Sequence, residues 1–447
     1  MSNNSLSVII LAAGKGTRMK SDLPKVMHKV AGCEMINHVI NNAKILKPKN
    51  INIISSSETM QYRDDIKQYH SDLNLNFIIQ HEKLGTGHAL KIALQNIKQQ
   101  DLGQKIIILY ADTPLVSSQT IDNLITKLDN HQICVAAFED NEPNMYGRLI
   151  IDDNNFLQKI IEFKDADEAQ KKVNICNSGI IAILAENIAQ LVSKIDNNNA
   201  SKEYYLTQLI EIANKNNYKC SYQIIDRNEV VGVNDKIELA NVEKIAQKII
   251  SHKLMKQGVT IINPESSFFA YDVKIGKNCV IYPNNYIGND VEIENNVIIN
   301  SFSHIVGAKI GSNSNIGPFA RIRPETLIED SCKIGNFVEI KKSQIAKNVK
   351  ISHLSYIGDS EINQNSNIGA GVVTCNFNGK KKFKTKIGKN SFIGSNSSLI
   401  APIEIGHDVM VGAGSVINKN INDKNTAIAR SKQVNLNKNY FNNDKKS

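Results

Sequence analysis

The pattern of hydrophobic and polar positions changes near Asn234, which divides the chain into two stretches. Before this residue, short runs of Val, Ile and Leu alternate with longer runs in which apolar residues recur at helical spacing. This alternation predicts an α/β domain whose largely parallel sheet is covered on both faces. We expect strands over residues 6–12, 51–55, 75–79, 105–110 and 133–138, and helices over residues 35–46, 86–97 and 119–128.

A long helix is predicted directly after this change, over residues 236–256. Apolar residues such as Ile237, Val242 and Ile249 recur there at helical spacing, and Gly258 ends the pattern. We expect this helix to join the two stretches.

After Gly258, one aliphatic residue recurs at every sixth position, with a few slips in phase. A repeat of six predicts a parallel β-helix, in which three short strands complete one coil and the aliphatic side chains stack inside. A β-sandwich would need a period of two, which does not hold one phase over so many sixes. The repeating residues are Ile275, Ile281, Ile287, Ile293, Ile299, Ile305, Ile310, Ile316, Ile322, Ile328, Ile334, Ile340, Ile345, Ile351, Ile357, Ile362, Ile368, Ile387, Ile393, Leu399, Ile405, Val411 and Ile417.

The longest gap in the repeat lies between Ile368 and Ile387, where a polar segment and a lysine cluster are inserted. An interrupted solenoid is typical of a loop on the binding face. The cluster would attract phosphorylated ligands or form only a solvated loop; it comprises Lys380, Lys381, Lys382, Lys384, Lys386 and Lys389. The predicted parts are an α/β domain over 1–233, a linking helix over 234–258, a β-helix over 259–430 and a flexible C-terminal tail over 431–447.

The composition narrows the class of function. The chain has 447 residues, 41% of them hydrophobic, and a formal net charge of +9. This charge fits small polyanions such as nucleotide triphosphates and coenzyme A; without a helix-turn-helix or interleaved aromatics, we expect no nucleic-acid partner. Seven cysteines without a CxxC pair indicate reduced thiols. The chain shows neither a signal-peptide pattern nor a membrane-spanning apolar run, so we expect a cytoplasmic protein that does not bind membranes.

The first predicted strand leads into a glycine-rich loop, Leu11-Ala12-Ala13-Gly14-Lys15-Gly16-Thr17-Arg18-Met19. Such a loop lets backbone N–H groups approach phosphates, and Lys15 and Arg18 add positive charge. The loop lacks the Gly-Lys-Ser/Thr end of a Walker A motif and the third glycine of a dinucleotide fingerprint. On its own it is equally typical of a structural turn.

Further motifs along the chain indicate which kind of protein this loop belongs to. Together they resemble the uridylyltransferase branch of the sugar-nucleotide pyrophosphorylase family. With the β-helix behind them, nearly the whole chain is similar to the bifunctional N-acetylglucosamine-1-phosphate uridylyltransferase/glucosamine-1-phosphate acetyltransferase family. The resemblance implies an α/β Rossmann-like nucleotidyltransferase domain followed by a left-handed parallel β-helix of hexapeptide repeats. The motifs are Leu23-Pro24-Lys25, Gln80, Leu84-Gly85-Thr86-Gly87-His88-Ala89, Tyr110-Ala111-Asp112-Thr113-Pro114-Leu115, Tyr146-Gly147-Arg148, Ile161-Glu162-x-Lys164-Asp165-Ala166, Asn177-Ser178-Gly179 and Gly232-Val233-Asn234.

The resemblance also implies roles in the first domain. Asp112 and Asn234 would hold Mg²⁺, which prefers oxygen ligands, and the catalytic residues Arg18 and Lys25 would neutralise charge on the phosphates. Alternatively, Asp112 is only a turn residue at a strand end and Asn234 only a helix cap. The nucleotide would contact Leu11, Ala12, Ala13, Gly14, Lys25, Gln80, Gly85, Thr86, Tyr110 and Asp112, and the sugar would contact Gly147, Glu162, Asn177 and Asn234. The family usually has Gly in place of Ala111 and Thr in place of Ser178.

In the β-helix, polar residues gather around His353. Acetylation of an amine by a thioester needs a base that takes the amine proton, and histidine suits this role at neutral pH. An arbitrary histidine would be a surface residue, but the surroundings of His353 resemble the acetyltransferase half of the family, which implies that it is the general base. By the same resemblance, Arg323, Lys341, Tyr356 and Asn367 would bind the sugar phosphate, and Ala370, Asn376, Phe377, Ser395, Ala413 and Arg430 would bind acetyl-CoA. The family usually has Tyr in place of Phe377 and Ala-Gly in place of Ile351-Ser352.

The predicted function is therefore a bifunctional synthesis of UDP-N-acetylglucosamine. Acetyl-CoA would acetylate glucosamine-1-phosphate, and UTP would then react with N-acetylglucosamine-1-phosphate and release pyrophosphate, supplying peptidoglycan and lipopolysaccharide precursors. The resemblance further implies a homotrimer with acetyl-CoA between neighbouring chains. Two alternatives stay open: a nucleotidyltransferase whose β-helix only oligomerises or regulates, and an inactive binding protein, which would require the loss of Lys25 or Asp112.

Overall fold

The computed structural model describes residues 3–142 and 144–436 of the chain. These residues belong to two compact units, Met1–Ala246 and Gln247–Ser447. Residues 431–436 are exposed and have no regular secondary structure, whereas the rest of the predicted flexible tail lies outside the described residues. Within the described part, none of the helices combines the length and the apolar character that crossing a membrane requires.

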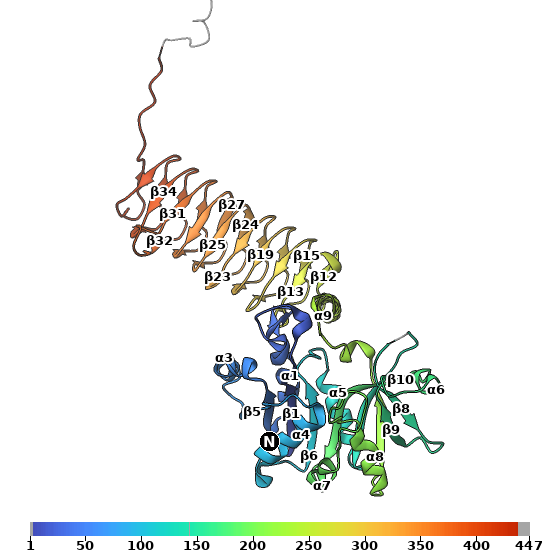
Figure 1. Ribbon diagram of the computed structural model, residues 1–447. Coiled ribbons are helices and arrows are strands. Elements are labelled where there is room, and N and C mark those ends of the chain that lie inside the picture. The colour runs from blue at the N-terminus through green and yellow to red at the C-terminus, as the bar shows by residue number, and fades with distance from the viewer. Residues whose placement is uncertain (1–2, 143, 437–447) are drawn as a thin grey trace, which may run out of the picture. The chain divides into compact units, whose positions relative to one another are not determined.

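The first unit is built from a nine-stranded mixed sheet and surrounding helices (Figure 1). Its strands are β1 (Asn3–Ala12), β4 (Pro48–Ser55), β5 (Leu75–Ile79), β6 (Lys105–Tyr110), β7 (Ile133–Glu139), β8 (Arg148–Ile151), β9 (Leu157–Ile161), β10 (Ile175–Leu184) and β11 (Cys220–Ile224), beside the small ribbon β2 (Lys29–Val30) and β3 (Cys33–Glu34). Its helices are α1 (Met35–Lys44), α2 (Ser57–Met60), α3 (Arg63–Tyr69), α4 (Thr86–Asn96), α5 (Ser118–Lys127), α6 (Glu168–Lys171), α7 (Ile188–Ser193) and α8 (Gln208–Lys215), with short 3-10 turns at Thr17–Met19, Lys25–Met27, Gln99–Asp101 and Arg227–Val230.

Alternating residues of β1 show why the sheet is covered on both faces. Val8 and Ile10 pack with Ile36 of α1 and Leu124 of α5 in one buried cluster. The intervening Ile9 and Leu11 pack in a second cluster with Leu90 of α4, Leu191 of α7 and Ile210 of α8. Successive side chains of a strand point to opposite faces, so each face receives its own hydrophobic core. The predicted α/β domain is confirmed.

The sheet has the order β11-β7-β10-β6-β1-β4-β5, and β8 and β9 form a hairpin that joins at β10. Strands β6, β1, β4 and β5 are parallel, as are β7 and β11. Strand β10 lies between β6 and β7 and is antiparallel to both. The sequence pattern predicted neither this strand nor the hairpin.

The predicted long helix is present as α9, Lys236–Lys256. The boundary between the two compact units falls inside it, because Val242 and Ala246 belong to the first unit and Leu254 to the core of the second. Thus the predicted helix is confirmed, while the division of the chain into 1–233, 234–258 and 259–430 stays a prediction.

The second unit is a left-handed parallel β-helix of three sheets, which we call faces one, two and three. Face one contains β12 (Thr260–Ile261), β15 (Val280–Ile281), β18 (Ile298–Ile299), β21 (Asn315–Ile316), β24 (Lys333–Asn336), β27 (Lys350–His353), β30 (Asn367–Ile368), β33 (Phe392–Ile393), β36 (Met410–Val411) and β38 (Thr426–Ala427). Face two contains β13 (Phe268–Phe269), β16 (Tyr286–Ile287), β19 (His304–Ile305), β22 (Arg321–Ile322), β25 (Glu339–Lys341), β28 (Tyr356–Gly358), β31 (Val373–Cys375), β34 (Ser398–Ile400) and β37 (Val416–Ile417). Face three contains β14 (Lys274–Ile275), β17 (Glu292–Ile293), β20 (Ala308–Ile310), β23 (Thr326–Ile328), β26 (Gln344–Ile345), β29 (Ser360–Ile362), β32 (Thr385–Ile387) and β35 (Ile403–Ile405), and a short 3-10 turn spans Pro264–Ser266.

The register of the coils follows the predicted repeat. Ile281 pairs with Ile299 and Ile299 with Ile316, so the one-residue slip in the sequence simply shortens one coil. Ile368 pairs with Ile393 across the inserted segment, which therefore leaves the stack as a loop without breaking it. All the repeating aliphatic residues belong to the buried core of this unit, which confirms the predicted β-helix.

Candidate functional sites

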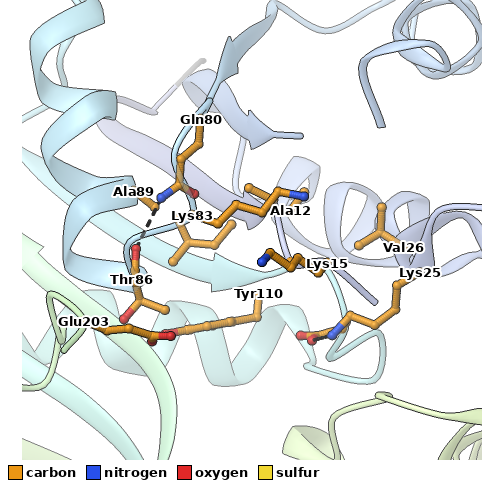
Figure 2. A pocket seen from close by; sticks show the side chains of 15 residues that line it. Ala12, Lys15, Lys25, Val26, Gln80, Lys83, Thr86, Ala89, Tyr110 and Glu203 are labelled. Atoms are coloured by element: carbon orange, nitrogen blue, oxygen red, sulfur yellow. Dashed lines mark hydrogen bonds and ion pairs between the residues drawn. The ribbon is translucent and has the colours of Figure 1, made fainter. Parts of the chain in front are cut away.

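A cavity of about 370 Å³ opens in the first unit, at the edge where the parallel strands β1, β5 and β6 end (Figure 2). In open α/β sheets, ligands bind outside the carboxyl ends of the strands. All ten residues that the sequence assigns to the nucleotide line this cavity: Leu11, Ala12, Ala13, Gly14, Lys25, Gln80, Gly85, Thr86, Tyr110 and Asp112. The structure therefore brings these residues together, although they come from distant parts of the chain.

The wall around Gln80 is shaped by close backbone packing. The Gln80 side-chain Nε2 donates to the carbonyl oxygen of Gly85 at 3.3 Å. Gly85 has a φ of +108°, and a Cβ there would stand 2.6 Å from the carbonyl oxygen of Tyr204, so a side chain would distort the loop. Thr86 then starts α4, and its hydroxyl accepts from the backbone N–H of Leu206 at 3.2 Å. Packing against residues 203–206 thus holds this wall in place.

Lys25 joins the two residues predicted to hold the metal. Its ammonium group pairs with the Asp112 carboxylate and donates to Asn234 Oδ1 at 3.2 Å. The backbone N–H of Val233 also donates to the carbonyl oxygen of Asp112 at 3.0 Å, which ties the end of β6 to the segment before α9. Two oxygen atoms therefore converge on a single positive charge, and a carboxylate with a carboxamide oxygen fits a hard cation such as Mg²⁺.

The start of α9 bears on the alternative interpretation of Asn234 as a helix cap. The Asp235 carboxylate, not the side chain of Asn234, accepts from the first helical N–H groups, those of Ile237 and Glu238, at 2.9 Å each. The side-chain oxygen of Asn234 accepts from Lys25 instead. The Asn234 side chain therefore contacts Lys25, which lines the cavity, and does not cap the helix.

Charged residues around the cavity differ in part from those predicted. Lys15 and Lys83 line it, and with Tyr110 they border the same space in Figure 2. Three further lining residues, Val26, Lys83 and Glu203, were not predicted from the sequence, although Lys83 stands between Gln80 and the Leu84-Gly85-Thr86 motif. Arg18 is exposed on the Thr17–Met19 turn and does not line the cavity, so its catalytic role stays a prediction.

Three of the four residues assigned to the sugar, Gly147, Glu162 and Asn177, form a second cluster in the same unit, whereas the fourth, Asn234, contacts Lys25. The backbone N–H of Asn177 donates to the carbonyl oxygen of Gly147 at 2.8 Å, and a Cβ built on Gly147 would lie 3.5 Å from Glu162 Oε2. Burial raises the pKa of Glu162, although the hydroxyl of Thr207 donates to its carboxylate at 3.0 Å and acts in the opposite direction. Burial also raises the pKa of Tyr110, and the negative charges of Glu162 and Asp112 act in the same direction. Tyr110 is thus influenced both by a residue predicted to bind the sugar and by one predicted to hold the metal.

In the β-helix, three cationic side chains gather beside face two. Arg323 Nη1 donates to Glu339 Oε1 at 2.8 Å. The neighbouring ammonium of Lys382 lowers the pKa of Lys341, and Arg323 acts in the same direction, so these three positive charges lie close together. Sequence analysis noted the lysine cluster but not that Lys382 in particular would face Lys341. These three cations outnumber the nearby carboxylates of Glu339, which pairs with Arg323, and Asp359, which acts on Lys341, and such an excess of positive charge suits a phosphate group.

His353 ends β27 at the corner between faces one and two, where its Nδ1 lies 2.6 Å from Asn336 Oδ1. Tyr356 and Asn376 lie close to each other on face two, because a Cβ built on Gly358 would lie 2.5 Å from the Tyr356 hydroxyl and 2.6 Å from Asn376 Nδ2. Asn367 lies on face one, where its Cα partner is Lys350. His353 thus ends β27 on face one, Tyr356 begins β28 on face two, and Asn376 directly follows β31.

The residues assigned to acetyl-CoA follow one corner of the β-helix over successive coils. The carbonyl oxygen of Ala370 accepts from the N–H of Asn396 at 2.7 Å, and that of Ser395 from the N–H of Gly414 at 2.8 Å. Arg430 continues the series, since its Nη1 donates to the carbonyl oxygen of Ala413 at 2.9 Å. In the inserted loop, the side chain of Phe377 is exposed, and its backbone forms an isolated antiparallel β-bridge with that of Lys382.

Known protein families match both units. A model described as a MobA-like NTP transferase domain matches residues 8–173. In the second unit, a model described as bacterial transferase hexapeptide (six repeats) matches residues 272–307 and 384–419, and one described as GMPPB C-terminal domain matches residues 305–381.

Curated relatives match nearly the full length of the chain. The bifunctional protein GlmU of Zymomonas mobilis subsp. mobilis is 43% identical over 96% of this chain and 95% of its own length. The protein of the same name from Wolbachia pipientis wMel is 41% identical over 97% of this chain and 99% of its own length. With such identity over both units, the chain belongs to the family of the bifunctional protein GlmU, enzymes of UDP-N-acetylglucosamine synthesis that combine a nucleotidyltransferase with an acetyltransferase.

Proposed function

We propose that the cavity of the first unit transfers the uridylyl group and that the corner of the β-helix around His353 transfers the acetyl group. The observation that carries this division is the group of cations formed by Arg323, Lys341 and Lys382 close to face two, on a solenoid that needs no such group to fold. It argues against a β-helix that serves only to oligomerise or regulate.

In the first unit, Lys15 from the glycine-rich loop and Lys25 from the Lys25–Met27 turn would bind the triphosphate of UTP, while Gln80, Gly85 and Thr86 hold the uracil. A phosphate oxygen of N-acetylglucosamine-1-phosphate attacks the α-phosphorus of UTP. The bond from that phosphorus to the bridging oxygen breaks, and pyrophosphate leaves with the electron pair. Lys25 would neutralise the charge that develops in this step.

The family is metal-dependent, and we propose Mg²⁺ as the metal of this chain. Asp112 and Asn234 would hold it, because their side-chain oxygens converge on one cationic atom. When bound, the ion would supply positive charge that draws the phosphates together and stabilises the leaving pyrophosphate.

In the second unit, the cations Arg323 and Lys341 would bind the phosphate of glucosamine-1-phosphate and so place its amine near His353. The amine nitrogen attacks the acetyl carbon of acetyl-CoA, the carbon–sulfur bond breaks, and coenzyme A leaves as the thiolate. His353 takes the proton that the amine gives up, and this proton then passes to the sulfur. Ala370, Ser395, Ala413 and Arg430 would hold acetyl-CoA along their corner, with Asn376 and Phe377 from the inserted loop.

We further propose a homotrimer, and an exposed apolar stripe supports it. Phe302, Phe319 and Phe337 stack on successive coils with ring centroids 5.0 Å apart, and Leu354 continues the row beside His353. All four have a positive φ, a backbone conformation that costs a bulky residue about 1–2 kcal/mol. Burying the stripe between chains would offset this cost and enclose the acetyl-transfer site. Because UTP and acetyl-CoA are cytoplasmic metabolites, we place the enzyme in the cytoplasm.

The test is to measure thiol release from acetyl-CoA in the presence of glucosamine-1-phosphate, for the native chain and for His353→Ala. Both proteins should form pyrophosphate from UTP and N-acetylglucosamine-1-phosphate, but only the native chain should release thiol. If the native chain forms pyrophosphate and releases no thiol, the β-helix is structural in this protein and the proposal fails.

A further inference from the structure

The His353 side chain has a hydrogen-bonding partner at its corner of the β-helix. Its residue partner one coil away is Asn336, at the same position of the neighbouring parallel strand β24. The His353 ring nitrogen Nδ1 lies 2.6 Å from the Asn336 side-chain oxygen Oδ1, which is a short hydrogen bond. His353 is exposed, and its second ring nitrogen, Nε2, takes no part in this contact.

The main chain fixes both members of this pair. Beside Asn336, a Cβ on Gly335 would lie only 1.9 Å from the carbonyl oxygen of Ser352, so the glycine lets the two strands approach closely. The N–H of Leu354 donates to the carbonyl oxygen of Asn336 at 3.0 Å, and the hydroxyl of Ser355 donates to that of His353 at 2.9 Å. The imidazole and the carboxamide therefore meet in a defined orientation.

With the Asn336 carboxamide oxygen turned toward the ring, this contact sets which ring nitrogen of His353 carries the proton. A carboxamide oxygen can only accept, so the Nδ1 atom must donate and carry the hydrogen. A neutral imidazole has a single N–H, which leaves a lone pair on Nε2. When Nε2 takes a proton, the ring becomes cationic, and the hydrogen bond from Nδ1 to Asn336 becomes stronger.

We propose that Asn336 is a positioning residue for acetyl transfer, which holds His353 in the tautomer and orientation that make Nε2 the base. The inference rests on the proposed role of His353. It predicts that the Asn336 side chain contributes to the chemical step and not to the binding of either substrate.

The test compares Asn336→Leu, which removes the acceptor at similar size, with Asn336→Asp, which keeps an oxygen at that position. For Asn336→Leu, kcat of acetyl transfer should fall about 10- to 100-fold, with KM for acetyl-CoA and glucosamine-1-phosphate nearly unchanged. For Asn336→Asp, kcat should recover to within about fivefold of the native value. The matched control is Asn315→Leu, since Asn315 lies on the same face and accepts a side-chain hydrogen bond from Asn300 at 2.6 Å.

Pyrophosphate formation is measured on every variant to show that the chain is folded and active at its other site. The inference is wrong if Asn336→Leu keeps the native kcat, if its loss lies in KM alone, or if Asn336→Asp and Asn315→Leu fall as far as Asn336→Leu. His353→Ala separates the two claims. If it retains acetyl transfer, the proposed function of His353 fails; if it alone loses activity, only the positioning role of Asn336 fails.

Discussion

In the proposed mechanism, single side chains determine the chemistry of both sites. Lys25 has the largest role at the nucleotide site of the first unit. It is only 10% exposed, and its ammonium group lies between the Asp112 carboxylate and the Asn234 carboxamide oxygen. In the proposed mechanism, this partly buried positive charge lies where negative charge develops during uridylyl transfer. The same contacts orient the two oxygens that would hold Mg²⁺.

Replacing Lys25 with Met should therefore lower the rate of pyrophosphate formation by about 100- to 1000-fold, the usual effect of losing one charge-stabilising group. Acetyl transfer by the same variant should stay within about twofold of the native rate. Steady-state assays of both reactions check this. A variant that forms pyrophosphate at the native rate would remove Lys25 from the mechanism.

His70 offers a prediction on stability and pH. It is buried beside Asn37, to whose Oδ1 its Nε2 lies at 3.1 Å, and burial lowers its pKa to about 4. In the unfolded chain the pKa of His70 is close to 6.5. Below pH 6.5 the unfolded chain therefore binds a proton that the folded chain does not bind. Stability is therefore fully present above pH 6.5 and is lost as the pH falls toward 4.

For this group alone, the free energy of unfolding should fall by about 2 kcal/mol between pH 7.5 and pH 5. In His70→Gln, the free energy of unfolding should fall over that pH range by about 2 kcal/mol less than in the native chain. Urea unfolding measures this difference. His252→Gln, at an exposed position of α9, is the control and should follow the native curve. Equal slopes for all three proteins would show that His70 is not neutral in the folded state.

At the scale of elements, the hexapeptide repeat made the β-helix predictable almost completely. Each inward position carries an aliphatic residue, and the slip between Ile305 and Ile310 only shortens one coil by a residue. In contrast, strand β10 was not predicted, because Asn177-Ser178-Gly179 interrupts its apolar run and the register shifts between Asn177 and Ile181. Its antiparallel place between β6 and β7 depends on contacts distant in sequence, which no local period encodes.

The close approach of β24 and β27 leads to a prediction about Gly335. A Cβ at this position would overlap the carbonyl oxygen of Ser352, so Gly335→Ala must separate the strands that bear Asn336 and His353. The β-helix should lose about 1–3 kcal/mol of stability, and acetyl transfer should decline with it. Thermal unfolding followed by circular dichroism measures the first effect.

Gly412→Ala is the control for Gly335→Ala, because there the nearest atom to the new Cβ is a side-chain carbon of Ile428 at 3.1 Å, which can move aside. If both variants unfold at the same temperature as the native chain, the close approach of β24 and β27 has no energetic importance.

At the scale of the whole molecule, the residues of the candidate sites were predicted better than their partners. The ten nucleotide residues line one cavity because family motifs mark the ends of neighbouring parallel strands. The pairing of His353 with Asn336 and of Lys341 with Lys382 was not predicted, since it arises from the stacking of coils. A repeat shows which residues point inward but not which outward side chains meet.

The apolar stripe gives a prediction about assembly. Phe319→Asn removes the central ring and places at that position a residue that tolerates a positive φ, so the single chain should remain folded. The proposed homotrimer of this variant should dissociate at a higher protein concentration than the native homotrimer does. Light scattering after gel filtration would show this. A variant whose mass stays equal to that of the native protein at every concentration would place the interface elsewhere.

The central claim is that one chain carries two independent sites, and complementation tests it most directly. The two variants Lys25→Met and His353→Ala are each given glucosamine-1-phosphate, acetyl-CoA, UTP and Mg²⁺, separately and then mixed, and UDP-N-acetylglucosamine is measured. We predict that neither variant alone forms the product at more than about a hundredth of the native rate and that the mixture forms it much faster, because His353→Ala uses the N-acetylglucosamine-1-phosphate released by Lys25→Met. Product formed by either variant alone at the native rate, or no gain in the mixture although each retains its other activity, would contradict the account.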